Sequence, residues 1–249
     1  MKNVMTNLKP SNERLAVVDS LRGFALLAIV LLHNLEHYNL ITFPESQLEW
    51  LNSLDKGVWS TLFFVFAGKA YATFSLLFGF SFYIQFRNAQ RRGDSFRGRF
   101  AWRMFLLFLF SQFHALFYNG DILLLYSVVG LVLIAVCNLK DRTILILAIV
   151  CLLQPLELLR MVYASINPEF TSYGHYYKQF WGLVKPVMAD GSFLEVLKSN
   201  IWHGQLYSNL WQVENGRLFQ TAALFMFVML LGRRVYFVKN EQSVVMWQR

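Results

Sequence analysis

The stretch from Arg14 to Tyr38 reads RLAVVDSLRGFALLAIVLLHNLEHY and sets the fold of the chain. Its centre is an uninterrupted apolar run from Gly23 to Leu32, with Arg22 before it and His33 after it. At about 1.5 Å per residue, Arg22 and His33 lie roughly 16 Å apart along a helix. Eleven steps of about 100° return both side chains to nearly the same face. The pattern predicts a membrane-spanning helix with a cation near one end and an imidazole near the other.

The polar ends of this helix admit two interpretations. In the simpler one, Asp19 and Arg22 pair across one turn and mark one end of the span. His33 and Asn34 are then interfacial residues at the opposite end. In the functional one, Arg22 and His33 face one enclosed polar space, because charged and titratable groups at membrane depth usually face a protein interior or a wet cavity.

The composition is typical of an integral membrane protein. Of 249 residues, 56% are hydrophobic and only 15% are charged, whereas soluble domains carry about 25% charged residues. The formal charge of +8 does not indicate a nucleic-acid partner, because the basic residues gather in loops expected on one side of the membrane. Cys137 and Cys151 lie in apolar runs and are expected to be packing residues.

We expect an all-α fold, a polytopic transmembrane helical bundle of about six spans. The thirty residues from Gly57 to Phe86 are too long for one upright span of about twenty. We therefore expect an acidic loop up to about Gly57, then a half-helix or interfacial segment, and then a break at Gly68. The expected spans are residues 17–35, 70–86, 100–118, 122–138, 143–163 and 218–231.

Basic residues predict the orientation. The segment from Arg87 to Arg103 contains six arginines and one acidic residue, Asp94. Basic loops favour the cytoplasmic side, so we expect this loop and both termini in the cytoplasm. The aromatic and polar residues 164–217 then lie outside as interfacial amphipathic helices. We expect residues 1–163 to form a five-span core, and residues 218–249 to form a sixth span with a cytoplasmic tail.

Four stretches resemble the YeiB-like bacterial inner-membrane proteins, a family built around a domain of unknown function. In chain order they are VDSLRGFALL, AGKAYATFSLLFGFSFYIQ, NGDILLLYSVVGLVL and ALFMFVMLLGRRVYF. The first, with His33 eleven residues after Arg22, also resembles the opening helix of the transmembrane acyltransferase and heparan-α-glucosaminide N-acetyltransferase superfamily. YeiB-like proteins commonly have Asn where His33 stands, and they usually continue well beyond the last motif. The resemblance therefore implies a C-terminally shortened chain that is closer to the acyltransferase branch.

The resemblance implies an activity and a location. Members move an acyl group from cytoplasmic acyl-CoA to a hydroxyl or amine acceptor, such as an envelope glycan or a small molecule. The lipid bilayer, acyl-CoA and that acceptor are the implied partners, with no bound cofactor, no metal and no nucleic acid. The implied location is the bacterial inner membrane, with several passes.

Candidate catalytic residues follow from this chemistry. His33 lies toward the outer face, where a neutral imidazole can accept the acceptor's proton or carry the acyl group. His114 is expected at a similar depth with Asp121 close by in sequence, so the three residues are predicted to share an outer pocket. The structural alternative is that Gln112 and His114 form helix-to-helix hydrogen bonds and that Asp121 caps the next helix.

Candidate donor-binding residues lie at the cytoplasmic side. The guanidinium of Arg22 can bind a CoA phosphate in a fork. Arg99 and Arg103 of the Arg-rich loop can attract the same polyanion. Such basic loops set topology in most membrane proteins, so this role competes with a purely topological one. Lys69 is expected to begin the second crossing and extend its amine to the interface.

Two other functions fit the same pattern. Intramembrane Arg, Lys and His also mark transport paths, so a transporter of an anionic solute or lipid is the first alternative. The second is a non-catalytic membrane assembly subunit.

Overall fold

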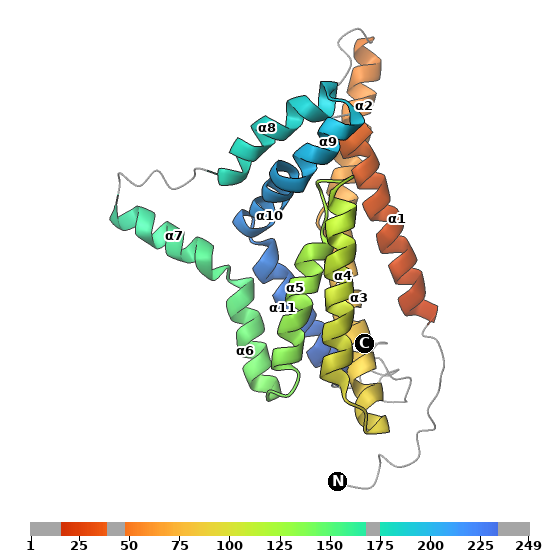
Figure 1. Ribbon diagram of the computed structural model, residues 1–249, viewed down its shortest axis with the longest axis vertical. Coiled ribbons are helices and arrows are strands. Elements are labelled where there is room, and N and C mark those ends of the chain that lie inside the picture. The colour runs from red at the N-terminus through yellow and green to blue at the C-terminus, as the bar shows by residue number, and fades with distance from the viewer. Residues whose placement is uncertain (1–15, 39–47, 168–174, 234–249) are drawn as a thin grey trace. The chain divides into compact units, whose positions relative to one another are not determined.

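The computed structural model describes residues 16–38, 48–167 and 175–233 of the chain. Within these ranges every regular element is a helix, so the predicted all-α class is confirmed (Figure 1). The elements are α1 (Ala16–Tyr38), α2 (Glu49–Phe66), α3 (Lys69–Arg92), α4 (Phe96–Ala115), α5 (Leu123–Val136), α6 (Asp141–Leu152), α7 (Pro155–Ile166), α8 (Tyr176–Asp190), α9 (Phe193–Ser199), the π-helix η1 (Asn200–Gly204), α10 (Gln205–Glu214) and α11 (Arg217–Arg233).

The chain divides into two compact units. The first runs up to Leu77 and the second begins at Phe78, so the boundary falls inside α3. The predicted division at residues 163/164 and 217/218 concerns function and stays a prediction.

The helices include candidate membrane spans. In the described ranges, residues Val18–Leu35 of α1 and the stretch Glu49–Arg92 are long and apolar enough to cross a bilayer. Two bent pairs raise the number to four if each pair is one span. They are α6 with α7, bent by 48°, and the stretch Phe193–Glu214 (α9, η1 and α10) with α11, bent by 63°. The molecule is thus a helical protein with two to four candidate spans, while six spans and cytoplasmic termini stay predictions.

The first unit confirms the opening helix and the predicted break. Helix α1 covers the expected first span and packs on α2, with the Phe24 and Phe66 rings 6.1 Å apart. At Gly68 the backbone has a φ of 73°, which interrupts the helix and favours glycine. Lys69 begins α3, and its amine donates to the Phe64 carbonyl and lies over the Phe64 ring.

The start of α2 corrects one expectation. The acidic loop was expected to reach about Gly57, but α2 already begins at Glu49. Trp50, Leu54 and Val58 follow one another at a spacing of four, which suits one face of a helix. The acidic residues between them obscured that periodicity.

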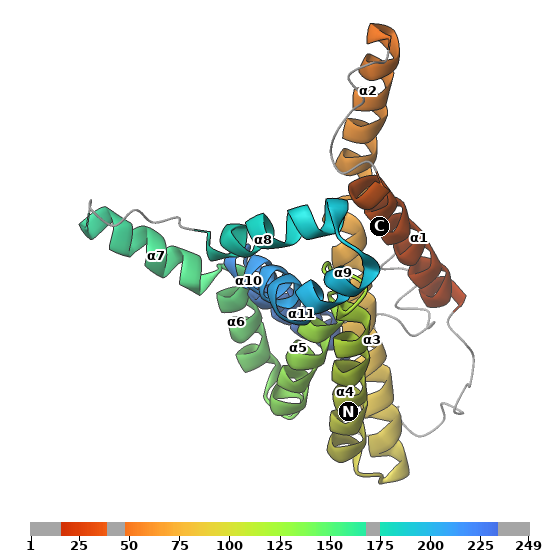
Figure 2. The ribbon, with the colours of Figure 1, turned by 45° about the horizontal axis from the view of Figure 1, so that its top comes forward.

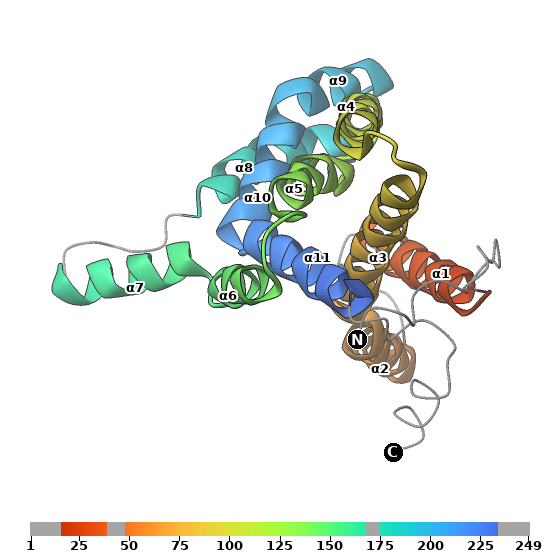
Figure 3. The ribbon, with the colours of Figure 1, turned by 90° about the horizontal axis from the view of Figure 1, so that it is seen from below.

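The second unit is organised around antiparallel helices (Figure 1 and Figure 3). Helix α4 packs along α5, and α11 packs against both α5 and α6. The core between them contains Tyr126 and Phe225, both fully buried, with ring centroids 5.4 Å apart. Helix α3 approaches α11 closely because Gly79 of α3 has no side chain and lies against the Phe225 backbone.

The predicted fifth span, residues 143–163, is bent by 48° and is one candidate span only if its two helices cross together. It breaks at Gln154, which has a φ of 55°, and α7 then begins at Pro155. Proline has no N–H to continue the hydrogen-bond ladder and disfavours a helical residue before it. Helix α7 has no buried residue and extends away from the rest of the second unit (Figure 2).

The described residues 175–214 of the aromatic and polar segment are mostly helical, while their interfacial location on the outer face stays a prediction. Helices α8, α9 and α10 pack on one another through η1, which also contacts α4. Helix α10 ends at an Asn215–Gly216 turn with a φ of 69° at Gly216, after which α11 begins. This layer covers the end of α4 and the turn that leads to α5, where the polar site lies.

Candidate functional site

The site is built around Asp121, in the turn between α4 and α5. The Leu123 N–H at the start of α5 donates to Asp121 Oδ1 at 3.1 Å. Asp121 thus accepts from the first N–H of α5, although the N-cap position itself is Ile122. The carboxyl is almost fully buried although it is charged at neutral pH in water, and burial raises the pKa of Asp121 above its ordinary value of 3.8.

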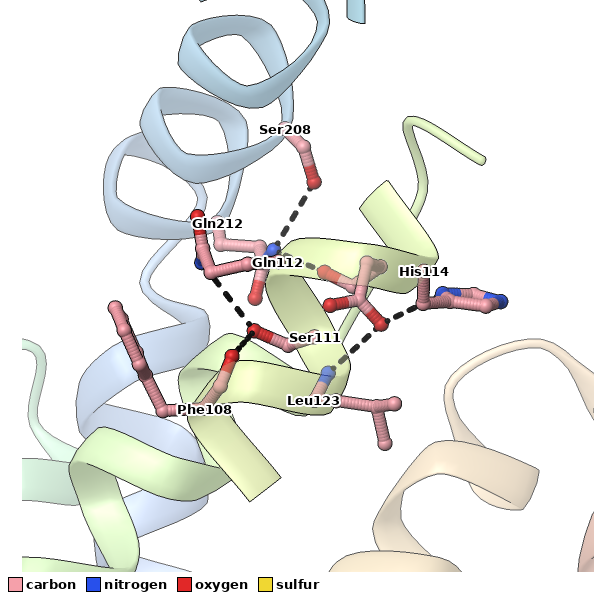
Figure 4. A network of polar contacts seen from close by, with 8 residues as sticks. Phe108, Ser111, Gln112, His114, Leu123, Ser208 and Gln212 are labelled. Atoms are coloured by element: carbon pink, nitrogen blue, oxygen red, sulfur yellow. Dashed lines mark hydrogen bonds and ion pairs between the residues drawn. The ribbon is translucent and has the colours of Figure 1, made fainter. Parts of the chain in front are cut away.

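The partner of this carboxylate is the imidazole of His114, near the end of α4. His114 Nδ1 lies 3.1 Å from the same Asp121 Oδ1 atom. Figure 4 marks this contact with a dashed line at His114. The His114 side chain is 49% exposed, whereas Asp121 is 6% exposed. The buried Asp121 carboxylate thus contacts one ring nitrogen of His114, while about half of the His114 side chain stays exposed.

Helix α10 fixes the turn from behind. Gln212 Nε2 donates to the backbone carbonyl of Asp121 at 2.9 Å and to Ser208 Oγ at 3.2 Å (Figure 4). Asn200, at the start of η1, donates to the Leu116 carbonyl at 2.9 Å. These amides tie the α4–α5 turn to the amphipathic layer, so the position of Asp121 depends on residues far away in the sequence.

A small pocket opens beside this network. Its volume is about 10 Å³, which is room for about one water molecule or one hydroxyl group. Hydroxyl, amide and carboxylate side chains predominate in its lining, which includes Ser111, Gln112, Asp121 and Ser208. Ser111 donates to the Phe108 carbonyl, and Gln112 donates to Ser111 at 3.4 Å (Figure 4).

Three buried acceptor atoms of the cluster have no donor among the residues described. They are Oδ2 of Asp121, Oδ1 of Asn200 and Oε1 of Gln212. Buried polar atoms are nearly always hydrogen-bonded to protein or to ordered water. The cluster is therefore suited to a small O–H donor, such as water or one hydroxyl group of a larger molecule.

Sequence reasoning placed His114 and Asp121 close together, and the structure shows their contact, but His114 does not line the small pocket. Sequence reasoning missed Gln212, Ser208 and Asn200. A signal for the missed residues exists. Positions 200, 204, 208 and 212 are Asn, Gly, Ser and Gln at a spacing of four, which puts them on one helix face. All four are buried, and Gly204 lets that face approach the α4–α5 turn closely.

The residues predicted on α1 belong to the first unit. Arg22 and Asp19 form the expected pair, with an N–O distance of 3.0 Å. His33 is half-buried and Asn34 is exposed. Neither Arg22 nor His33 lines the small pocket beside Asp121, and a polar space shared by His33 and His114 stays a prediction.

Arg99 and Arg103 line a second pocket, at the opposite end of α4. Its volume is about 210 Å³, and it lies between the last turns of α3 and the first turns of α4. The structure adds Arg92 of α3 to the two predicted arginines. Sequence reasoning had placed Arg92 in the same basic loop without assigning it to a site.

Two bacterial relatives resemble this chain. It is 34% identical over 160 residues to "Uncharacterized protein YxaH" of Bacillus subtilis (strain 168), a match that covers 58% of this chain and 38% of that protein. It is 32% identical over 142 residues to "Uncharacterized 39.9 kDa protein in amylase 3'region" of Bacillus acidopullulyticus, covering 57% and 39%. The chain thus spans about two fifths of the length of these relatives. No family model and no solved structure matches it.

Proposed function

We propose that the chain forms part of a membrane-bound acyltransferase in which His114 is the general base. Its imidazole removes the proton of an acceptor hydroxyl as that oxygen attacks the thioester carbonyl of an acyl-CoA. The tetrahedral intermediate then expels the CoA thiolate, which takes up the proton from the imidazolium. An ester and free CoA result, and the histidine returns to its neutral form.

The contact between Asp121 and His114 carries this proposal. A carboxylate that accepts a hydrogen bond from Nδ1–H fixes the tautomer and leaves the Nε2 lone pair available as a base. The same carboxylate stabilises the imidazolium that forms during transfer. His114 does not line the small pocket beside Asp121; its half-exposed ring is open to a hydroxyl acceptor from outside that pocket.

The arrangement of the second unit supports a multi-pass orientation in the bacterial inner membrane. The turn between α3 and α4 and the turn between α5 and α6 lie toward the same end (Figure 1). Arg233, at the end of α11, donates to Asp141, the first residue of α6, at 2.6 Å. Basic segments gathered at one end agree with a cytoplasmic side there, and with His114 toward the opposite side.

The test is an acyl-transfer assay on the purified chain reconstituted in lipid. The probe is acetyl-CoA labelled in the acetyl group, with a bacterial envelope extract as the source of acceptors. His114→Ala is expected to lower label transfer about 100-fold or more, the usual contribution of a general base. His203→Ala, the same change at another exposed histidine, is the matched control and is expected to keep the activity.

Three outcomes contradict the proposal. They are the absence of transfer by the unmodified chain, full activity of His114→Ala, and equal losses in His114→Ala and His203→Ala. His33→Ala runs in parallel, because a loss there alone would place the base on α1 instead. Movement of an anionic solute across the membrane without consumption of acetyl-CoA would indicate the transporter alternative.

A further inference from the structure

The hairpin of α3 and α4 contains a cationic pocket that the proposed transfer reaction does not use. The pocket has a volume of about 210 Å³ and is lined by Arg92, Arg99 and Arg103 together with the amides Gln85 and Asn88. It lies at the end of α4 away from His114. Three guanidinium groups around one cavity favour an anionic occupant.

The arginines keep most of their donors for such an occupant. Arg92 Nε lies 2.9 Å from Asp94 Oδ2, and Arg99 Nη2 lies 2.8 Å from the same oxygen. Arg99 Nε also donates to the Ser95 carbonyl at 3.1 Å, and Arg103 Nη1 donates to Gln85. Each guanidinium has five N–H groups, so the three arginines have fifteen. Most of these donors remain available to an anionic occupant.

Asp94 organises the arginines without neutralising them. It does not line the pocket, and one carboxylate against three guanidinium groups leaves two net positive charges. The hydrogen bond from Arg99 lowers the pKa of Asp94 below its ordinary value of 3.8. The carboxylate therefore stays ionised at neutral pH and holds Arg92 and Arg99 in place.

The size of the pocket limits what enters it. Pockets that take whole small molecules have volumes of about 300–1,000 Å³, and this one is smaller. The inner wall is apolar and rigid, because Phe96 and Phe100 are buried and pack edge to face against Phe82 at 5.2 and 4.7 Å. The cavity is thus suited to one anionic group that belongs to a larger molecule outside it.

The surface next to the pocket indicates what that larger molecule is. Along α4, Arg99 and Arg103 are followed on the same face by Leu106, Phe110 and Phe113, at spacings of four, three, four and three. These three apolar side chains are 38%, 68% and 63% exposed. A cationic pocket that continues into an exposed apolar face matches a molecule with a phosphate at one end and a hydrocarbon chain at the other.

We propose that this pocket binds the phosphate headgroup of an anionic phospholipid, with an acyl chain along Leu106, Phe110 and Phe113. Arginine pairs with phosphate through parallel N–H donors, and basic pockets between membrane helices on the cytoplasmic side bind acidic headgroups. The phosphates of CoA share the headgroup chemistry. However, CoA would place a polar nucleotide and a polar arm where the structure offers an apolar face. The lipid takes no part in the chemistry of the transfer reaction at His114.

The experiment measures lipid retention by the purified chain in detergent, using native mass spectrometry with phosphatidylglycerol and phosphatidylcholine. The pocket variant is Arg92→Gln with Arg103→Gln. The control variant is Arg91→Gln with Arg97→Gln, which removes the same charge from exposed arginines of the same hairpin that do not line the pocket. Two basic contacts predict about 30-fold weaker phosphatidylglycerol binding for the pocket variant, and less than about threefold for the control.

A second variant tests the apolar half of the site. Phe110→Ser leaves every arginine in place and is expected to weaken phosphatidylglycerol while leaving inorganic phosphate unaffected. The proposal fails if the pocket and control variants lose phosphatidylglycerol equally, or if phosphatidylcholine binds as well as phosphatidylglycerol. It also fails if CoA or inorganic phosphate displaces the lipid from the unmodified chain at equal concentration, because the site would then serve a soluble phosphate. Thermal unfolding of each variant in detergent confirms that the comparison is between folded proteins.

Discussion

Substitution of Gly79 by alanine tests the close approach of α3 and α11 in the second unit. Gly79 lies on α3 where it meets α11. A Cβ atom added there would be 2.9 Å from both Cα and O of Phe225. Both atoms belong to the backbone, so no side-chain rotation relieves the contact. The two helices must move apart by about 0.5 Å to reach the ordinary contact distance of 3.4 Å.

The cost of that movement follows from what surrounds the contact. Phe225 is fully buried, and its ring stacks on Phe78 with centroids 4.7 Å apart. Overpacking a close-packed core costs about 1–3 kcal/mol. Alanine returns up to about 1 kcal/mol through its higher helix propensity. The expected net loss is about 1–2 kcal/mol, which lowers the ratio of folded to unfolded protein about 5- to 30-fold.

The assay is unfolding in mixed micelles with increasing SDS, followed by tryptophan fluorescence. Gly182→Ala is the matched control, because it is the same change inside helix α8, where an added Cβ meets nothing within 4 Å. That control is expected to gain about 0.5–1 kcal/mol. If Gly79→Ala is stabilised as much as Gly182→Ala, the close approach of α3 and α11 does not exist and the packing argument is wrong.

Further predictions use the same unfolding assay. Gly216→Ala is expected to lose about 1–3 kcal/mol, because its φ of 69° strains an L-residue and its Cβ would lie 2.2 Å from Gln154 Oε1; unchanged stability would contradict this turn. Arg233→Gln removes a charged hydrogen bond to Asp141 and is expected to lower the free energy of unfolding by about 1–2 kcal/mol at this partly exposed site. If that loss disappears at high salt, the contact is only a surface ion pair. Burial raises the pKa of Asp121, so the folded chain keeps this proton at pH values where the unfolded chain has lost it. The free energy of unfolding therefore falls as pH rises from about 3.8 through the raised folded pKa, and Asp121→Asn is expected to flatten that fall relative to the wild type.

The parts of the fold that the sequence predicted well are determined by neighbouring residues. An apolar run of sufficient length produces α1, and Gly68 interrupts the next stretch because only glycine readily takes its φ. His114 and Asp121 are seven residues apart across one turn, so their contact needed no knowledge of distant elements. Local pattern and local geometry coincide at each of these positions.

The parts that it did not predict depend on distant residues or on competing signals. Gln212 contacts Asp121 although the two are 91 residues apart. The spacing of four among positions 200, 204, 208 and 212 predicts a polar helix face, but it does not predict which turn that face covers. Arg92 belongs to the second pocket only because α3 and α4 fold back on each other. The bend at Gln154 was obscured because the residues on both sides are apolar enough for one continuous span.

Helix α4 joins the two pockets of the second unit with a single unbroken rod. Between Arg99 and His114 its sequence has no glycine or proline, the usual causes of a kink. Near its middle, Met104 lies against Gly130 of α5, where even one added methyl group would collide with the sulfur. Tilting the rod about that contact would displace its two ends in opposite directions. Occupancy of the arginine end therefore has a mechanical route to the distance between His114 and Asp121.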